Sequence, residues 1–329
     1  MAERIRSPRL WVAAAFIGLL ALVPVIAALA GQPYYVTVFS RIMVFGLAAV
    51  GLNLILGFGG LVSFGHALYI GIGAYSVGIL SFHGVSNGFA HLGAALAVGA
   101  VAAVLIGLVC LRTSGMAFIM ITLAFAQMFY FLAVSLRQYG GDDGMSIASR
   151  SDLILVSLDE VTVLYYLIFG LLAGALYAFH RAVHSRFGMV LRGCRANERR
   201  MIALGFPTLR YKLAAYVVSA LVCVVAGVLL ANLTRYASPA YMQWIVSGDL
   251  IVMILFGGMN TLLGPVVGSA AIVMIEDLLS AFRLGLPWGI DAIVSTHWMA
   301  LLGALIIVVV LVLKQGLYGW LVAREAGAD

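Results

Sequence analysis

The sequence predicts an all-α polytopic membrane protein with about ten transmembrane segments, some of them broken or re-entrant. Its 329 residues are 64% hydrophobic and only 10% charged, and the mean hydropathy is +1.11. A soluble fold of this length could not bury so much apolar surface. Strands of a membrane barrel would alternate in polarity, whereas the apolar runs here are continuous. The 37 glycines suit helices that approach closely in lipid.

Ten apolar runs define the expected segments, which form one transmembrane domain over residues 1–329. Most runs have the roughly 20 residues that a helix needs to cross a bilayer. The first run follows Arg4, Arg6 and Arg9 and is long for the core of a signal peptide, so we expect a retained helix. In order, the runs cover residues 10–30, 36–56, 61–82, 92–111, 116–136, 161–179, 213–231, 244–256, 262–280 and 297–313.

Charge sets the expected orientation, because cytoplasmic loops carry an excess of Lys and Arg. The loop 181–212 holds eight of the chain's 19 Lys and Arg against one acid, Glu198, and is assigned to the cytoplasm. The loop 137–160 carries five acids against two Arg and is assigned to the periplasm. Six crossings from a cytoplasmic N-terminus agree with both assignments, and ten crossings place the C-terminus in the cytoplasm as well.

Glycine interrupts the apolar pattern at two places. The break at 257–265 divides one long run into two segments; without that division the chain has nine crossings and an external C-terminus. Residues 58–61 (FGGL) and 256–259 (FGGM) resemble each other. Paired glycine breaks in the two halves of a transporter indicate the transport path, although glycine is frequent throughout this chain. The predicted path comprises Asn53, Gly59, Gly60, Ser63, Gly65, His66, Gly257 and Gly258.

Sequence patterns of catalysis do not occur in the chain. Neither Lys212 nor Lys314 follows a glycine, which excludes a P-loop, and G-x-S-x-G, H-E-x-x-H and C-x-x-C are also missing. We therefore predict no catalytic residue, no metal site and no cofactor in this chain. The excess of positive charge follows from topology and does not indicate nucleic-acid binding.

Few ionisable residues lie within the apolar runs, which disfavours a proton-driven carrier. His66 is the strongest candidate, but we prefer a hydrogen-bonded packing role beside a glycine turn. Asp249 is expected at the N-cap or first turn of the short segment, and Glu276-Asp277 near a helix end. For Asn53 and Gln127 we expect hydrogen bonds between helices, with a place on the path as the alternative.

Several motifs occur in order along residues 45–280: 51–57 (GLNLILG), 59–67 (GGLVSFGHA), 140–144 (GGDDG), 186–188 (RFG), 191–198 (LRGCRANE), 203–205 (ALG), 211–214 (YKLA), 256–259 (FGGM) and 263–265 (LGP). Together they resemble the permeases of branched-chain amino acid ABC importers, in particular the LivM-type subunit. Cys194 and Phe206-Pro207 depart from the family pattern without removing the loop's role.

The resemblance implies a type II-like importer permease fold in which the loop 181–212 couples to an ATPase. Independently of it, the alanines and arginines of 192–204 favour a helix, Gly205 and Pro207 are stop signals, and Glu198 is spaced to pair with Arg195. The predicted coupling residues are Arg192, Arg195, Glu198, Arg199, Ala203, Leu204 and Gly205.

The resemblance also implies partners and a location in the bacterial inner membrane. The partners are a second, LivH-type permease subunit, two cytoplasmic ATPase subunits that hold ATP-Mg, and a periplasmic substrate-binding protein. The cargo would be Leu, Ile or Val moved inward, or urea, short amides or aromatic acids, because such importers select mainly at the binding protein. An ion-coupled secondary transporter and a non-transporting scaffold are the alternatives from other classes.

Overall fold

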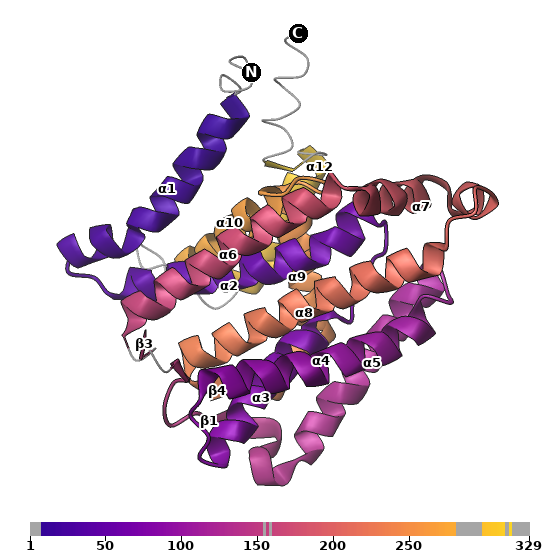
Figure 1. Ribbon diagram of the computed structural model, residues 1–329. Coiled ribbons are helices and arrows are strands. Elements are labelled where there is room, and N and C mark those ends of the chain that lie inside the picture. The colour runs from indigo at the N-terminus through magenta and orange to yellow at the C-terminus, as the bar shows by residue number, and fades with distance from the viewer. Residues whose placement is uncertain (1–7, 154–155, 158–159, 281–297, 313–315, 318–329) are drawn as a thin grey trace.

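A computed structural model describes residues 8–153, 156–157, 160–280, 298–312 and 316–317, which are mostly helical (Figure 1). Five of the helices are long and apolar enough to cross a membrane, namely Tyr34–Phe58, Gly88–Cys110, Met116–Ser135, Val161–Val183 and Thr208–Thr234. The helices are α1 (Pro8–Leu29), α2 (Tyr34–Asn53) with the π turn η2 (Leu54–Phe58), α3 (His66–Phe82), α4 (Gly88–Cys110), α5 (Met116–Ser135), α6 (Val161–Val183), α7 (Arg186–Ala203), α8 (Thr208–Thr234), α9 (Trp244–Gly257), α10 (Gly264–Ser280) and α12 (Trp298–Val312).

Each predicted apolar run coincides with a helix, with differences at the ends. Helix α3 begins at His66, five residues later than the run that starts at Leu61, because residues 61–65 are not helical. The expected role of Asp249 in an N-cap or first turn is wrong. The N-cap of α9 is Gln243, and Asp249 is exposed in the second turn of that helix. The number of membrane crossings stays a prediction.

Helix α8 is at the centre of the bundle and packs against α2, α3 and α4. The backbones of α8 and α3 touch each other at glycine residues. A Cβ added at Gly227 would lie 1.9 Å from the Ile70 carbonyl oxygen, and one added at Gly73 would lie 2.1 Å from that of Val224. Small residues allow this approach, which the apolar environment of a membrane does not otherwise drive. The abundance of glycine in the sequence is therefore explained here by packing.

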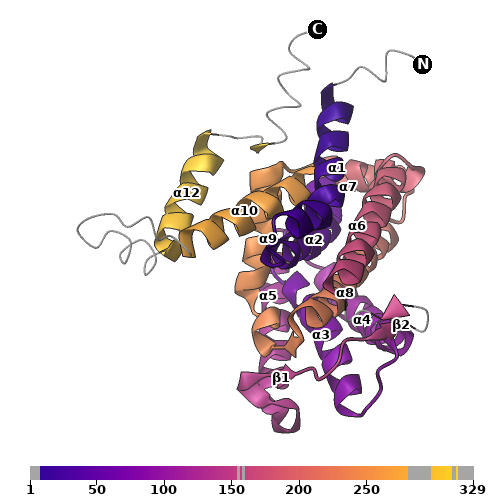
Figure 2. The same cartoon turned by 90° about the vertical axis from the view of Figure 1, so that its left-hand side faces the viewer.

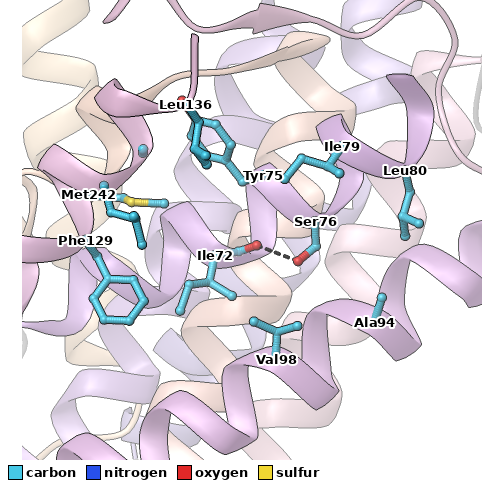
Figure 3. Close-up of a pocket in the computed structure, with 12 residues that line it drawn as sticks. Ile72, Tyr75, Ser76, Ile79, Leu80, Ala94, Val98, Phe129, Leu136 and Met242 are labelled. Carbon is cyan, nitrogen blue, oxygen red and sulfur yellow. Dashed lines mark hydrogen bonds between the residues drawn. The ribbon is translucent and has the colours of Figure 1, made fainter. Parts of the chain in front are cut away.

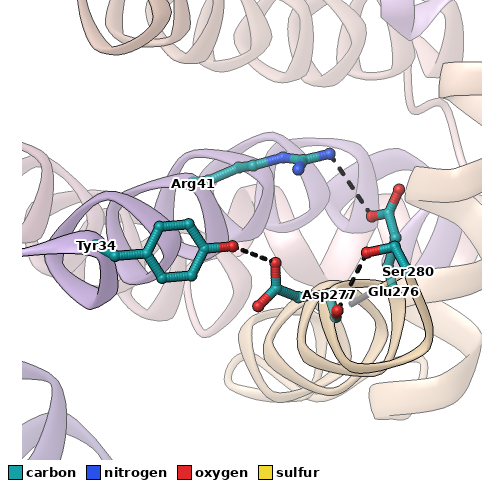
Figure 4. Close-up of polar contacts among 5 residues, drawn as sticks. All are labelled: Tyr34, Arg41, Glu276, Asp277 and Ser280. Carbon is teal, nitrogen blue, oxygen red and sulfur yellow. Dashed lines mark hydrogen bonds and ion pairs between the residues drawn. The ribbon is translucent and has the colours of Figure 1, made fainter. Parts of the chain in front are cut away.

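Helices α2 and α10 lie side by side and are joined by polar contacts near one end (Figure 4). The Tyr34 hydroxyl donates to the Asp277 carboxylate at 2.5 Å, and Arg41 forms an ion pair with Glu276 at 3.6 Å. Glu276 and Asp277 are thus near a helix end, as expected, and both are engaged. Deeper in the pair, the Ser269 hydroxyl lies 3.2 Å from the Ile42 carbonyl oxygen.

Short strands gather at the end of the bundle opposite to α7 (Figures 1 and 2). Strand β1 (Met145–Ser146) pairs antiparallel with β4 (Tyr236–Ala237), and β2 (Asp152–Leu153) with β3 (Val156–Ser157). The Arg150 Nε and the Ser151 amide donate to Asn232 near the end of α8. The loop 137–160 is in this way anchored to the central helix.

Candidate functional site

The end of α2 has a regular glycine cap. The Leu61 amide donates to the Ile55 carbonyl at 2.8 Å and the Gly60 amide to that of Leu56 at 3.2 Å, with Gly60 at φ +70°. This is the left-handed cap that commonly closes a helix and favours glycine. The chain turns away after one π-helical turn, a feature often found at functional sites.

The end of α9 is also broken at glycine. Gly258 has φ +117°, and the Thr261 hydroxyl donates to its carbonyl at 2.7 Å while accepting from the Gly264 amide at 3.1 Å. A Cβ added at Gly257 would lie 1.7 Å from the Gly264 carbonyl oxygen, so the backbones of α9 and α10 touch there. A bulky substitution at Gly257 would therefore disturb this packing whether or not Gly257 lines a path.

The two breaks meet in space. The Asn53 side-chain amide donates to the Thr261 carbonyl at 2.8 Å. The sequence predicted a bond between helices, whereas Thr261 lies in the turn that connects α9 to α10. A Cβ added at Gly57 would lie 3.1 Å from the Asn260 amide nitrogen and 2.2 Å from Asn53 Oδ1. Segments about 200 residues apart thus form one junction, which we call the glycine junction (Asn53–Leu61 with Gly257–Gly264).

Arg195 of α7 joins both sides of the glycine junction. Its Nη1 donates to the Gly57 carbonyl at the end of α2 and to Asn260 Oδ1 beyond the end of α9. Carbonyls at a helix C-terminus carry partial negative charge and attract a cation. A Cβ at Gly60 would lie 2.8 Å from Arg195 Cγ, so glycine also leaves room for the arginine side chain.

These contacts correct the predicted pair between Glu198 and Arg195. Glu198 pairs instead with Lys212 of α8 at 2.5 Å, and the Lys212 side chain is only 10% exposed. A guanidinium can satisfy several acceptors in one plane, which suits the two oxygens of the junction. The ammonium of Lys212 is a point charge and takes the carboxylate. The sequence spacing was compatible with the first pair but could not reveal these distant partners.

Helix α7 is longer than predicted and is kinked. It begins at Arg186 rather than Arg192, and Asn197 has non-helical backbone angles (φ −161°, ψ 99°). The Asn197 side chain accepts from the Arg200 amide at 3.0 Å, which is the bond of an N-cap, so a new helical turn starts there. The expected stop at Gly205 is confirmed by its φ of +85°. Asn197 itself was the sequence signal for the kink.

The remaining coupling residues differ in their surroundings. Arg192 folds back and donates to the Val183 carbonyl at the end of α6 at 3.2 Å. Arg199, Ala203, Leu204 and Gly205 are exposed. Two further apolar residues, Ile202 and Phe206, lie beside Leu204 at the exposed end of α7 and were not predicted from the sequence. Ile202 is 57% exposed, Leu204 65% and Phe206 39%. We call Ile202, Leu204 and Phe206 the apolar tip.

A second group of predicted path residues lies at the start of α3, just after the glycine junction in the chain: Ser63, Gly65 and His66. His66 is fully buried, with Nδ1 2.9 Å from Ser63 Oγ and Nε2 3.0 Å from Ser219 Oγ. Ser219 donates its proton to the Gly51 carbonyl at 2.6 Å, so it must accept from Nε2–H. Both ring nitrogens of a neutral His66 are thereby used. This is the hydrogen-bonded packing role preferred from the sequence, and it ties α3 to α8 and α2.

Comparison with known proteins identifies the family. The family model of the branched-chain amino acid transport system permease component matches residues 34–311.

The chain belongs to this family.

Among curated relatives, the high-affinity branched-chain amino acid transport permeases LivM of Salmonella typhimurium and Escherichia coli are each 23% identical over 306 residues, covering 86% of this chain and 69% of theirs. LivH of Escherichia coli is 24% identical over 294 residues, covering 84% and 91%. No solved structure matches. The chain is thus a LivM-like permease, a transport protein of the membrane, as the motifs indicated. The described residues contain no cluster of three His, Cys, Asp or Glu side chains that could hold a metal ion.

Replacing Arg195 by Gln should loosen the glycine junction. Charge-assisted hydrogen bonds contribute of the order of 1 to 3 kcal/mol, and the amide cannot reach both acceptors. We expect faster amide hydrogen exchange at 57–61 and 258–264 and a lower melting temperature. Arg199→Gln, one turn along α7 at an exposed position, is the matched control and should change neither. Equal exchange in Arg195→Gln and wild type would contradict the role of Arg195.

Proposed function

We propose that the chain is a transmembrane subunit of an ATP-driven importer of the bacterial inner membrane that moves Leu, Ile or Val inward. A LivH-type permease would complete the pore, two ATPase subunits would hold ATP-Mg, and a periplasmic binding protein would deliver the cargo. Family membership and the names of the relatives support this proposal. The observation that carries its mechanism is the bridge from α7 through Arg195 to both glycine breaks.

The apolar tip is the proposed contact with an ATPase subunit. Three exposed apolar side chains at the end of a basic helix have no core to join within the described residues. Such a patch, rimmed by polar groups, is typical of a protein interaction site. Gly205 closes the helix behind it with a left-handed turn, and a Cβ there would meet no atom within 4 Å. The tip can therefore enter a groove on a partner without rearrangement of this chain.

Movement of the tip would reach the pore through Arg195. A partner that closes on ATP would bias a two-state element, as coupling requires. The segment between Arg195 and the apolar tip contains the kink at Asn197. Within this segment, Glu198 forms an ion pair with Lys212 of α8. Displacing α7 would pull on Gly57 and Asn260 together. Because both lie where helices end at glycine, the ends of α2 and α9 can shift without breaking regular helical hydrogen bonds.

The path itself would use backbone groups at these helix ends. Broken helices within a transporter offer N–H groups to a carboxylate and C=O groups to an ammonium. A zwitterionic amino acid could then pass without a charged side chain dedicated to it. The same groups would serve urea, short amides or aromatic acids, which stay as alternative cargoes. An ion-coupled carrier is less favoured, because both nitrogens of His66 already have partners.

Ten crossings with both termini in the cytoplasm complete the proposal. The chain reverses between α9 and α10 at the glycine junction, where Arg195 of the proposed cytoplasmic helix reaches it. The strand-rich loops then face the periplasm, where a loaded binding protein would dock.

Replacing Leu204 by Gln should uncouple transport. The polar side chain removes apolar contact from the tip without changing charge, so the ATPase subunits should no longer co-purify and uptake by reconstituted vesicles should fall severalfold. Met189→Gln is the matched control, since Met189 is another exposed apolar residue of α7 (59% exposed, against 65% for Leu204) but lies outside the tip. If Leu204→Gln transports and co-purifies normally, the docking role is wrong.

A cysteine at Ser280 tests the number of crossings. Ser280 is exposed at the end of α10, which ten crossings place in the periplasm and nine in the cytoplasm. We expect an impermeant maleimide to label Ser280→Cys in intact spheroplasts and Gly205→Cys only after permeabilisation. Protection of Ser280→Cys until permeabilisation would support nine crossings.

A further inference from the structure

Asp249 is a charged residue for which the described chain provides no counterion. It is exposed on α9 and takes part in no hydrogen bond or ion pair within the described residues. The charged group that acts on it is another acid, Glu276 of α10, which already holds Arg41 of α2 in an ion pair at 3.6 Å. Its negative charge is therefore offset by nothing in the described part of the chain.

The chain reaches α9 from inside the bundle. The turn η5 (Pro239–Met242) precedes the helix, and its Met242 lines an apolar hollow together with Ile72 and Tyr75 of α3 (Figure 3). A Cβ added at Gly71 of α3 would lie 2.0 Å from Met242 Cγ. Helix α9 therefore starts alongside α3 rather than at the layer of strands that ends the bundle.

Asp249 lies far from both ends of the bundle. Just before it, the Ser247 hydroxyl accepts from the Ala67 amide at 2.8 Å, and Ala67 is about 16 Å along α3 from Gly78, which packs against β1 and β4. In the other direction, Asp249 is about 12 Å along α9 from Gly257 of the glycine junction. Because the hydrocarbon core of a bilayer is about 30 Å thick, the carboxylate lies near the middle of the membrane.

The surroundings of Asp249 favour a protein neighbour over lipid or water. A charged side chain at this depth is costly in lipid, and such residues face protein or a water-filled cavity. Asp249 is the only charged residue of α9, and the exposed side chains beside it are apolar, with Trp244 43% and Ile245 52% exposed. A Cβ at Gly248 would make only an ordinary contact of 3.7 Å with Phe64, so packing within this chain does not require glycine there. A small residue at this position leaves room for another helix.

We propose that this face of α9 binds a different polytopic membrane chain, which places a Lys or Arg side chain against the Asp249 carboxylate. Such a partner covers the apolar surface and neutralises the charge. A second copy of this chain, related by a two-fold axis, would set the same acidic face against itself. The inference rests on the proposed function in one respect, because it takes the second permease subunit of the importer as the partner.

Photocrosslinking tests this surface. Benzoylphenylalanine replaces Ile245, one turn before Asp249 on the same face, in the full chain in membranes of the native host. We expect ultraviolet light to join it to the second permease subunit, identified by mass spectrometry. The matched control is benzoylphenylalanine at Val101 of α4, which is similarly exposed (61%, against 52% for Ile245) and should form adducts with lipid only.

Charge variants test the pairing of Asp249. Asp249→Glu keeps the charge and should retain the crosslink, whereas Asp249→Asn should lower its yield severalfold. Asp249→Arg should abolish it, because two cations would then meet. Asp249→Asn guards against misfolding of the arginine variant, since it removes no hydrogen bond or ion pair within the described residues and should leave the melting temperature of the purified chain unchanged.

Three outcomes would overturn the proposal: a crosslink to a second copy of this chain, adducts with lipid alone at Ile245, or an equal yield in wild type, Asp249→Asn and Asp249→Arg. Leucine uptake by an importer in which Ile245 meets only lipid would overturn the interface and leave the import function. A charge-dependent crosslink without leucine uptake would support the interface and overturn the proposed cargo.

Discussion

One guanidinium group, that of Arg195, joins α7 to the ends of two helices of the bundle. It satisfies the Gly57 carbonyl left free by the cap of α2 and the Asn260 side chain beyond α9. Both acceptors lie where helices end, and the cation offsets the partial negative charge that gathers at such ends. Gly60 is required twice, for its left-handed conformation and for the space beside Arg195. The bend of α7 at Asn197 then directs the apolar tip away from the bundle.

The membrane makes such a junction necessary. Without a hydrophobic force between helices in lipid, close backbone contact and hydrogen bonds hold them together. Gly73 and Gly227 bring α3 against α8, and Gly257 brings α9 against α10. A rigid bundle of this kind needs defined places to change shape. The two breaks at glycine provide such places.

Much of the architecture could be predicted from the sequence, because apolar runs of spanning length in lipid have almost no alternative to helix. The cap at Gly205 also followed from residue chemistry. The partner of Arg195 could not be predicted. Local spacing favoured Glu198, whereas the actual acceptors lie 138 and 65 residues away. Asp249 was misplaced because a polar residue before an apolar run imitates a cap. Ile202 and Phe206, the other two residues of the apolar tip, were not predicted because isolated apolar residues in a basic loop carry no periodic signal.

The most direct test of this account is the distance between the two breaks during the ATPase cycle. Spin labels at Val62 and Met259, beside the junction, would be measured by double electron–electron resonance in the assembled importer with and without a trapped nucleotide. We predict that the nucleotide changes this distance when Arg195 is present, and that Arg195→Gln abolishes the change while ATP is still hydrolysed. The same change in distance in both proteins would contradict the claim that Arg195 carries movement from α7 to the pore.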